Sequence, residues 1–103
     1  QWHEIDQLVA QGWELIDVRS SFEHSRGTIP GAEFVALDSI RDNLNSLRGR
    51  QLIVFDRVGQ RAHTAASILS LEGIAVKNLD GGYLTWQLGT QATTPSIKEA
   101  TTP

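Results

Sequence analysis

The chain alternates short apolar runs with segments of helical spacing, and this alternation limits the folds that it can adopt. Four of the runs are typical of β-strands and read WELIDV, EFVAL, QLIVF and IAVKNL. Between the runs, apolar residues recur every three or four positions, as they do on one face of a helix. Strands that alternate with helices are typical of an open α/β sheet. We therefore predict a small, open and mainly parallel sheet with helices on both faces.

The helical segments are placed by their ends and by their apolar residues. The first predicted helix ends at Gly12, and a longer one in DSIRDNLNSLRG begins at Asp38 or Ser39. Between them, RSSFEHSRG predicts one or two helical turns that Ser20 or Ser21 caps. The predicted inner faces hold Ile5, Leu8 and Val9 in the first helix, and Ile40, Leu44 and Leu47 in the longer one.

The run QLIVF is apolar on both faces, which predicts a central strand of a parallel sheet. A helix that starts near Arg61 and ends at Gly73 follows it. Its inner face holds small residues and one leucine: Ala62, Ala65, Ala66 and Leu69. Ligands of open α/β sheets bind at the carboxyl ends of the strands, and the segment 56–61 lies at such an end.

This loop, which consists of Asp56, Arg57, Val58, Gly59, Gln60 and Arg61, has the features of an anion-binding loop. A tight loop before a helix turns successive backbone N–H groups inward. Gly59 permits a backbone conformation that other residues resist. Arg57 and Arg61 add positive charge, and Arg61 stands where its planar guanidinium can face an oxyanion. We expect a small anion as one partner of the loop.

Charge and cysteine content exclude several functions. A net charge of -3 argues against a nucleic-acid surface, which needs a basic face. The chain has no cysteine and therefore neither a disulfide nor a thiol nucleophile. No run is long enough to span a bilayer and no signal-peptide pattern opens the chain, so we expect no membrane partner and a cytoplasmic location.

Three segments, LIDVRSSFEHSRGTIPGAEFVAL, VFDRVGQRA and VKNLDGGYLTW, resemble the signature segments of the rhodanese-like domain family in order and spacing. The resemblance implies a domain over residues 1–88 and leaves residues 89–103, rich in Thr, Ser and Pro, as a flexible C-terminal tail. In this sulfurtransferase family the loop reads C-x-x-G-x-R, and its cysteine carries a persulfide. Here Asp56 stands at the cysteine position, whereas Gly59 and Arg61 match the motif.

The combination VGQRAHTAASIL and VKNLDGGYLTW is most similar to rhodanese domains at the C-terminus of flavoproteins of the coenzyme A-disulfide reductase and NADH oxidase type. This resemblance implies a flavoprotein reductase domain in the same chain as the partner. FAD and NAD(P)H would belong to that domain, and we expect no cofactor in this one. A start at Gln1 instead of methionine is what we expect of a segment of a longer protein.

An aspartate at the cysteine position changes the expected chemistry. Sulfur transfer needs a soft nucleophile that holds sulfur in a stable S–S bond, and a carboxylate cannot do so. We therefore expect no sulfurtransferase activity and a regulatory, anion-binding or interdomain role. A carboxylate on Cβ reaches about as far as the outer sulfur of a persulfide and carries a similar charge. Asp56 would then fill the anion site from within and hold the loop as in the sulfur-loaded state.

Other interpretations of Asp56 stay open. Asp56 can be a nucleophile for phosphoryl transfer, if Asp17 and Asp80 approach it in space and help to hold a divalent metal. Asp56 can also merely cap the turn that follows it. The chain can also be an active member of the sulfurtransferase family despite the replacement. An aspartate introduced by experiment in place of a natural cysteine would give the same sequence.

The remaining polar side chains are assigned structural or surface roles. Asp17 and Arg19 match the DVR motif of the family, which implies an ion pair or hydrogen-bond link after the first strand. We expect Glu23 on an exposed helical turn and both His24 and His63 on helix surfaces. Histidines placed in this way do not form a metal site, so we expect none. Gly81 and Gly82 are explained by a turn, and Thr28 stands where the family usually has histidine.

Overall fold

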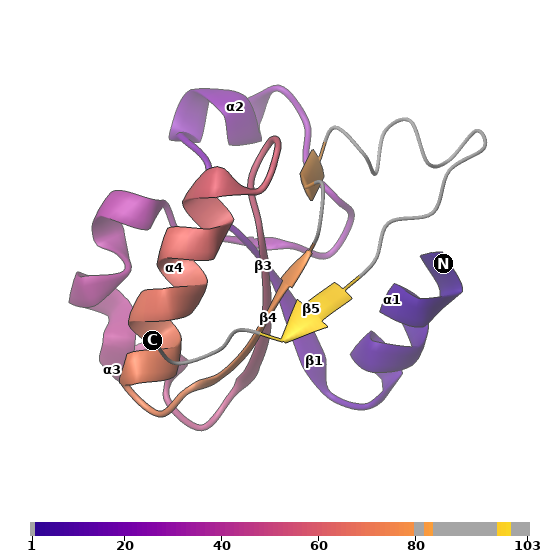
Figure 1. Cartoon of the computed structure of the whole chain (residues 1–103). Coiled ribbons are helices and arrows are strands. Elements are labelled where there is room, and N and C mark those ends of the chain that lie inside the picture. The colour runs from indigo at the N-terminus through magenta and orange to yellow at the C-terminus, as the bar shows by residue number, and fades with distance from the viewer. Residues whose placement is uncertain (1, 80–81, 84–96, 100–103) are drawn as a thin grey trace.

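A computed structural model of the chain describes residues 2–79, 82–83 and 97–99 (Figure 1). The described strands form one sheet in the order β2 (Glu33–Phe34), β1 (Trp13–Asp17), β3 (Gln51–Phe55), β4 (Ala75–Leu79) and β5 (Ile97–Glu99). The first four strands are parallel, and β3 lies at the centre of the sheet, as QLIVF predicts. The predicted α/β fold with a mainly parallel sheet is confirmed.

Strand β5 lies inside residues 89–103, which we predicted as a flexible tail, and the sequence analysis did not predict this strand. It pairs with β4 in antiparallel register, with Leu79 opposite Ile97 and Lys77 opposite Glu99. The outer edge of β4 offers unpaired backbone N–H and C=O groups that another strand can satisfy. A three-residue strand is too short to show a period in the sequence. The predicted domain limit at residue 88 stays a prediction.

Helices cover both faces of the sheet (Figure 1). Alternate side chains of β3 point to opposite faces, so that Leu52 and Val54 join one apolar cluster, whereas Ile53 and Phe55 join the other. Helices α3 (Leu44–Leu47) and α4 (Gln60–Leu71) supply the first cluster, and α1 (Trp2–Ala10) supplies the second. The four residues predicted for the inner face of α4 are all buried: Ala62, Ala65, Ala66 and Leu69.

Two details of the predicted helices are wrong. Val9 is 46% exposed, whereas Ile5 and Leu8 of the same helix pack into the second apolar cluster. The predicted helix at 38–49 is broken into 3-10 turns at Leu37–Ser39 and Arg41–Asn43, followed by α3. The side chain of Asn43 donates to the carbonyl of Ser39 at 2.7 Å, a local bond that competes with helical pairing. The apolar spacing still holds, since Ile40 and Leu47 are buried and Leu44 packs against them.

The topology fixes where a site can form. From β1 the chain passes through α2 (Ser21–Ser25) to β2 on one side, whereas from β3 it passes through α4 to β4 on the other side. The loops after β1 and β3 therefore diverge at a switch point of the sheet, where ligands of open α/β folds bind. Of the helices within the described residues, none is long and apolar enough to cross a bilayer. The predicted terminal helix in YLTWQL lies outside the described residues except for Tyr83.

Candidate functional site

The loop between β3 and α4 closes around the side chain of Asp56. Helix α4 begins at Gln60, one residue before the predicted start, and Gly59 before it has a φ of 108°, a conformation that favours glycine. The carboxylate of Asp56, which is 1% exposed, accepts hydrogen bonds from the N–H of Gly59 and, at 2.7 Å, from the N–H of Arg61. The side chains of Val58 and Gln60 are exposed. The backbone amides expected to face an external anion thus bind an internal carboxylate.

Arg61 is also held by internal carboxylates. Its guanidinium donates two hydrogen bonds to Glu23 on α2, at 2.7 and 3.0 Å, and its Nε lies 3.4 Å from Asp56. The bonds from Arg61, together with those from Ser20, lower the pKa of Glu23 from 4.5 to about 2, and the bonds to Glu23 raise the pKa of Arg61. The predicted direction of Arg61 toward a free oxyanion is therefore not what the structure shows.

Glu23 does more than the expected exposed turn residue. Its carboxylate accepts from the N–H of Ser20 at 3.1 Å, and Ser20 accepts from the N–H of Glu23 at 3.2 Å. This reciprocal capping box fixes the start of α2, and its cap is Ser20, one of the two residues that we predicted. Because Glu23 also binds Arg61, it links α2 to the loop after β3. The S-x-x-E spacing signals the cap, whereas the link to Arg61 has no signal in the sequence.

A buried cluster centred on Asp17 supports the loop after β1. Arg19 donates to both carboxylate oxygens of Asp17, at 2.8 and 2.7 Å, and to the carbonyl of Gly27 at 2.6 Å. The predicted link between Asp17 and Arg19 is confirmed. Thr28 donates to the same carboxylate at 2.9 Å, and His24 Nδ1 lies 2.9 Å from it. His24 is therefore a partner of Asp17, not the plain surface residue that we expected.

Burial and hydrogen bonding act in opposite directions on Asp17. Burial alone would raise its pKa, but the bonds from Arg19, His24 and Thr28 outweigh that effect and lower the pKa. The same pairing with Asp17 raises the pKa of Arg19. The pair thus stays ionised although both side chains are almost fully buried, at 0% and 4% exposure.

Gly82 and Tyr83, which are both helical, pack directly on the loop. A Cβ at Gly82 would overlap the carbonyl oxygen of Asp56 and lie 2.9 Å from the backbone of Arg57. The N–H of Tyr83 donates to the carbonyl of Asp56 at 2.6 Å, and the Tyr83 ring lies 4.2 Å from the guanidinium carbon of Arg19. Gly82 therefore permits close approach to the site, and our interpretation that a turn alone explains it is wrong. Asp80 and Gly81 lie outside the described residues.

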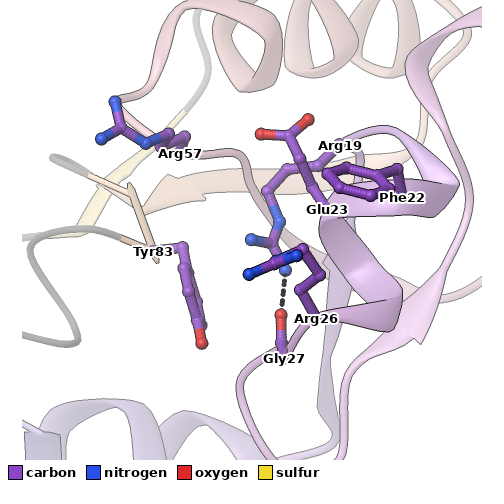
Figure 2. A pocket seen from close by; sticks show the side chains of 7 residues that line it. All are labelled: Arg19, Phe22, Glu23, Arg26, Gly27, Arg57 and Tyr83. Atoms are coloured by element: carbon purple, nitrogen blue, oxygen red, sulfur yellow. Dashed lines mark hydrogen bonds between the residues drawn. The ribbon is translucent and has the colours of Figure 1, made fainter.

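An open pocket of about 360 Å³ lies beside the loop (Figure 2). Figure 2 shows Arg57 and Tyr83 on one side of it and Phe22, Glu23 and Arg26 on the other. Arg19 and Gly27 complete the lining. Of the predicted loop residues, Arg57 alone lines this pocket, which the sequence motif did not reveal because α2 contributes the facing wall.

The hydrogen bonds of Asp56 and Asp17 argue against the alternative function of phosphoryl transfer. Both oxygens of Asp56 accept N–H groups and the side chain is 1% exposed, so the carboxylate does not face solvent, where a phosphoryl group would approach. Asp17 is engaged by Arg19, His24 and Thr28. Within the part of the chain that the structure describes, no three His, Asp or Glu side chains gather as a metal site requires.

Comparisons with known proteins give the family and similar folds. The family model described as the rhodanese-like domain matches residues 1–88. The structure of reduced CoADR-RHD from Bacillus anthracis is 40% identical, with a TM-score of 0.76, and it is matched over 87% of this chain and 16% of that chain. The human single-domain sulfurtransferase TSTD1 is 27% identical, with a TM-score of 0.73, over 82% of this chain and 90% of that chain.

A curated bacterial protein is also similar to this chain. YtwF of Bacillus subtilis (strain 168), named as a candidate sulfurtransferase, is 28% identical over 71% of this chain and 72% of its own length. The chain therefore spans most of YtwF and TSTD1 but only about a sixth of CoADR-RHD. The motif around Asp56, the fold and the family match lead to one conclusion: this chain belongs to the rhodanese-like domain family, with sulfurtransferases among its relatives.

Proposed function

We propose that this rhodanese-like domain does not transfer sulfur and serves as a binding module whose loop is held in the shape of the sulfur-loaded state. The observation that carries the proposal is the position of Asp56. Its buried carboxylate stands at the place of the nucleophile and accepts the N–H groups of Gly59 and Arg61. The N–H groups of Gly59 and Arg61 form the cradle of this loop, and the carboxylate of Asp56 occupies it permanently. The loop therefore keeps its conformation without binding or releasing a ligand.

The chemistry of the side chain supports the same proposal. Sulfur transfer requires that the nucleophile form an S–S bond and then yield its sulfur to an acceptor thiolate or cyanide. A carboxylate forms no comparable stable bond with sulfur, and the chain has no cysteine elsewhere to replace it. The carboxylate also repels thiosulfate, because both are anions. These properties argue for recognition of the domain surface instead of turnover.

We further propose that the domain works beside a flavoprotein reductase domain in the same chain. The 40% identity to CoADR-RHD, over a sixth of that chain, supports this assignment, together with the sequence resemblance to the coenzyme A-disulfide reductase type. FAD and NAD(P)H would then be bound by the partner domain, and the location would be cytoplasmic. In this arrangement the reductase domain would always meet the Asp56 loop in one conformation. In a domain with a cysteine, the loop would instead change with the presence or absence of the persulfide.

The decisive experiment compares the chain with its Asp56→Cys and Asp56→Ser variants. Thiosulfate:cyanide sulfurtransferase activity is measured, and mass spectrometry detects the added sulfur atom of a persulfide. We expect no turnover by the natural chain or by Asp56→Ser, which keeps a small polar side chain without a thiol. Asp56→Cys should gain the sulfur atom and turn over, because Gly59 and Arg61 still present their N–H groups.

Two outcomes would contradict the proposal. Turnover by the natural chain would show that the carboxylate takes part in sulfur transfer or is bypassed. Magnesium-dependent hydrolysis of p-nitrophenyl phosphate, lost in Asp56→Ser, would favour phosphoryl transfer instead.

A further inference from the structure

Within the described residues, the pocket beside the loop has a positive charge that the ion pairs of the site do not compensate. Arg19 is neutralised by Asp17, and Glu23 is neutralised by Arg61. This leaves Arg26 and Arg57, which form none of the ion pairs among the described residues. Two cations thus border one pocket in a chain whose net charge is -3. A local field opposite in sign to the overall charge is suited to attract an acidic partner.

The same pocket also has an apolar wall that is open to solvent. Phe22 is 67% exposed and lies beneath the guanidinium of Arg26, 5.5 Å from its carbon. Tyr83 closes the other side, and Val58, next to Arg57 on the loop, is 49% exposed. Exposed aromatic rings next to arginines are the composition of protein-binding hot spots. A free inorganic anion would use the arginines and leave Phe22 and Val58 in water.

We propose that this pocket binds an acidic polypeptide segment of a partner domain, with an apolar side chain of that segment placed against Phe22. The carboxylates of the segment would pair with Arg26 and Arg57. The volume of about 360 Å³ is enough for one large side chain and its neighbours. The inference rests on the proposed function, because it names the chemistry of the partner that the binding module would recognise.

Continuity with the Asp56 loop connects the pocket to the state of the site. Arg57 follows Asp56 directly, and its backbone lies against Gly82, next to Tyr83. Glu23, which faces the pocket, holds Arg61 in the first turn of α4. A partner seated between Arg26 and Arg57 would therefore contact both walls that Asp56 and Arg61 keep in place. Recognition of the filled cradle then requires no direct contact with the buried carboxylate.

The test uses the 103-residue chain and a defined peptide. The probe is a fluorescein-labelled heptapeptide with six glutamates around one phenylalanine, and affinity is measured by fluorescence anisotropy. The variants are Arg26→Glu and Arg57→Glu, and the matched control is Arg41→Glu, another exposed arginine outside the pocket. We expect each pocket variant to weaken binding about tenfold, as for a hot-spot residue, and Arg41→Glu to change it less than about twofold.

A second measurement locates the peptide. Amide shifts in a ¹⁵N spectrum should move at Phe22, Arg26 and Arg57 and should stay unchanged around Arg41. Replacement of the central phenylalanine by glycine should weaken binding about tenfold, which separates the apolar contact from charge alone. The six-lysine version of the peptide should not bind.

The proposal fails if Arg41→Glu weakens binding as much as Arg57→Glu, because general charge attraction would then explain the affinity. It also fails if the central phenylalanine is irrelevant and inorganic phosphate or thiosulfate produces the same amide shifts, which would indicate a small-anion pocket. Absence of peptide binding by a chain that also lacks sulfurtransferase activity would overturn this inference alone. Sulfurtransferase activity of the natural chain would instead overturn the proposed function.

Discussion

Asp56→Ala is the change that most directly tests how the loop is held together. It removes the acceptor of the N–H groups of Gly59 and Arg61, the latter bond being 2.7 Å long. Hydrogen bonds to a charged group contribute about 1.5 to 3 kcal/mol each, so two of them set an upper value near 6 kcal/mol. In the variant, water can enter beside the exposed Arg57 and Val58 and accept part of the hydrogen bonding that the carboxylate provided. We therefore expect the free energy of unfolding to fall by about 3 kcal/mol.

Urea unfolding followed by tryptophan fluorescence measures this loss. With a slope of about 1 to 1.5 kcal/mol per molar urea for a domain of this size, the midpoint should fall by about 2 to 3 M. The matched control is Asp42→Ala, which also removes one carboxylate but from an exposed position. It should change stability by less than about 0.5 kcal/mol.

Sulfate adds a second readout, because the emptied cradle offers two N–H groups to an anion. At a sulfate concentration ten times the dissociation constant, Asp56→Ala should regain about 1.4 kcal/mol beyond the general salt effect seen with Asp42→Ala. If Asp56→Ala loses no more stability than Asp42→Ala and shows no specific sulfate response, the cradle does not depend on the carboxylate and our reasoning is refuted.

Three further changes test the neighbouring contacts. At neutral pH, Glu23→Gln should lower the free energy of unfolding by about 1 kcal/mol, the upper value for a partly solvated ion pair such as that of Glu23 with Arg61. The pKa of Glu23 is lowered to about 2, so the wild-type contribution is full above pH 4.5 and is lost as the pH falls toward 2. Urea midpoints at several pH values should show a flatter profile for the variant, and an unchanged slope would contradict this. Arg19→Met leaves Asp17 as a buried carboxylate without its cation and should lower the free energy of unfolding by about 3 to 5 kcal/mol. The double variant with Asp17→Asn should recover part of this lost stability, which thermal unfolding of both variants can test. Gly82→Ala should lower the free energy of unfolding by about 1 to 3 kcal/mol more than Gly49→Ala does. Both glycines have a positive φ, but only a Cβ at Gly82 would overlap the backbone of Asp56. Equal melting temperatures of the two variants would exclude that contact.

The sequence alone determined the alternating α/β architecture, apart from β5, because the signals for it are local. The apolar run of β3, the small residues on the inner face of α4 and the glycine at position 59 each require only their own neighbours in the chain. The cap of α2 at Ser20 is local in the same way, since its partner Glu23 lies three residues away. The link between Asp17 and Arg19 also spans only two positions.

Only the tertiary structure decided how these parts form a site. Arg61 and Glu23 are 38 positions apart, and they meet because parallel strands β1 and β3 bring the loops that follow them to one edge of the sheet. Gly82 meets the backbone of Asp56 for the same reason, after β4 has returned the chain to that edge. The pocket between Arg26 and Arg57 exists only once α2 faces the loop. Local patterns fix which residues are helical or extended, but contacts across the sheet depend on strand order, and strand order is set by the packing of the whole core.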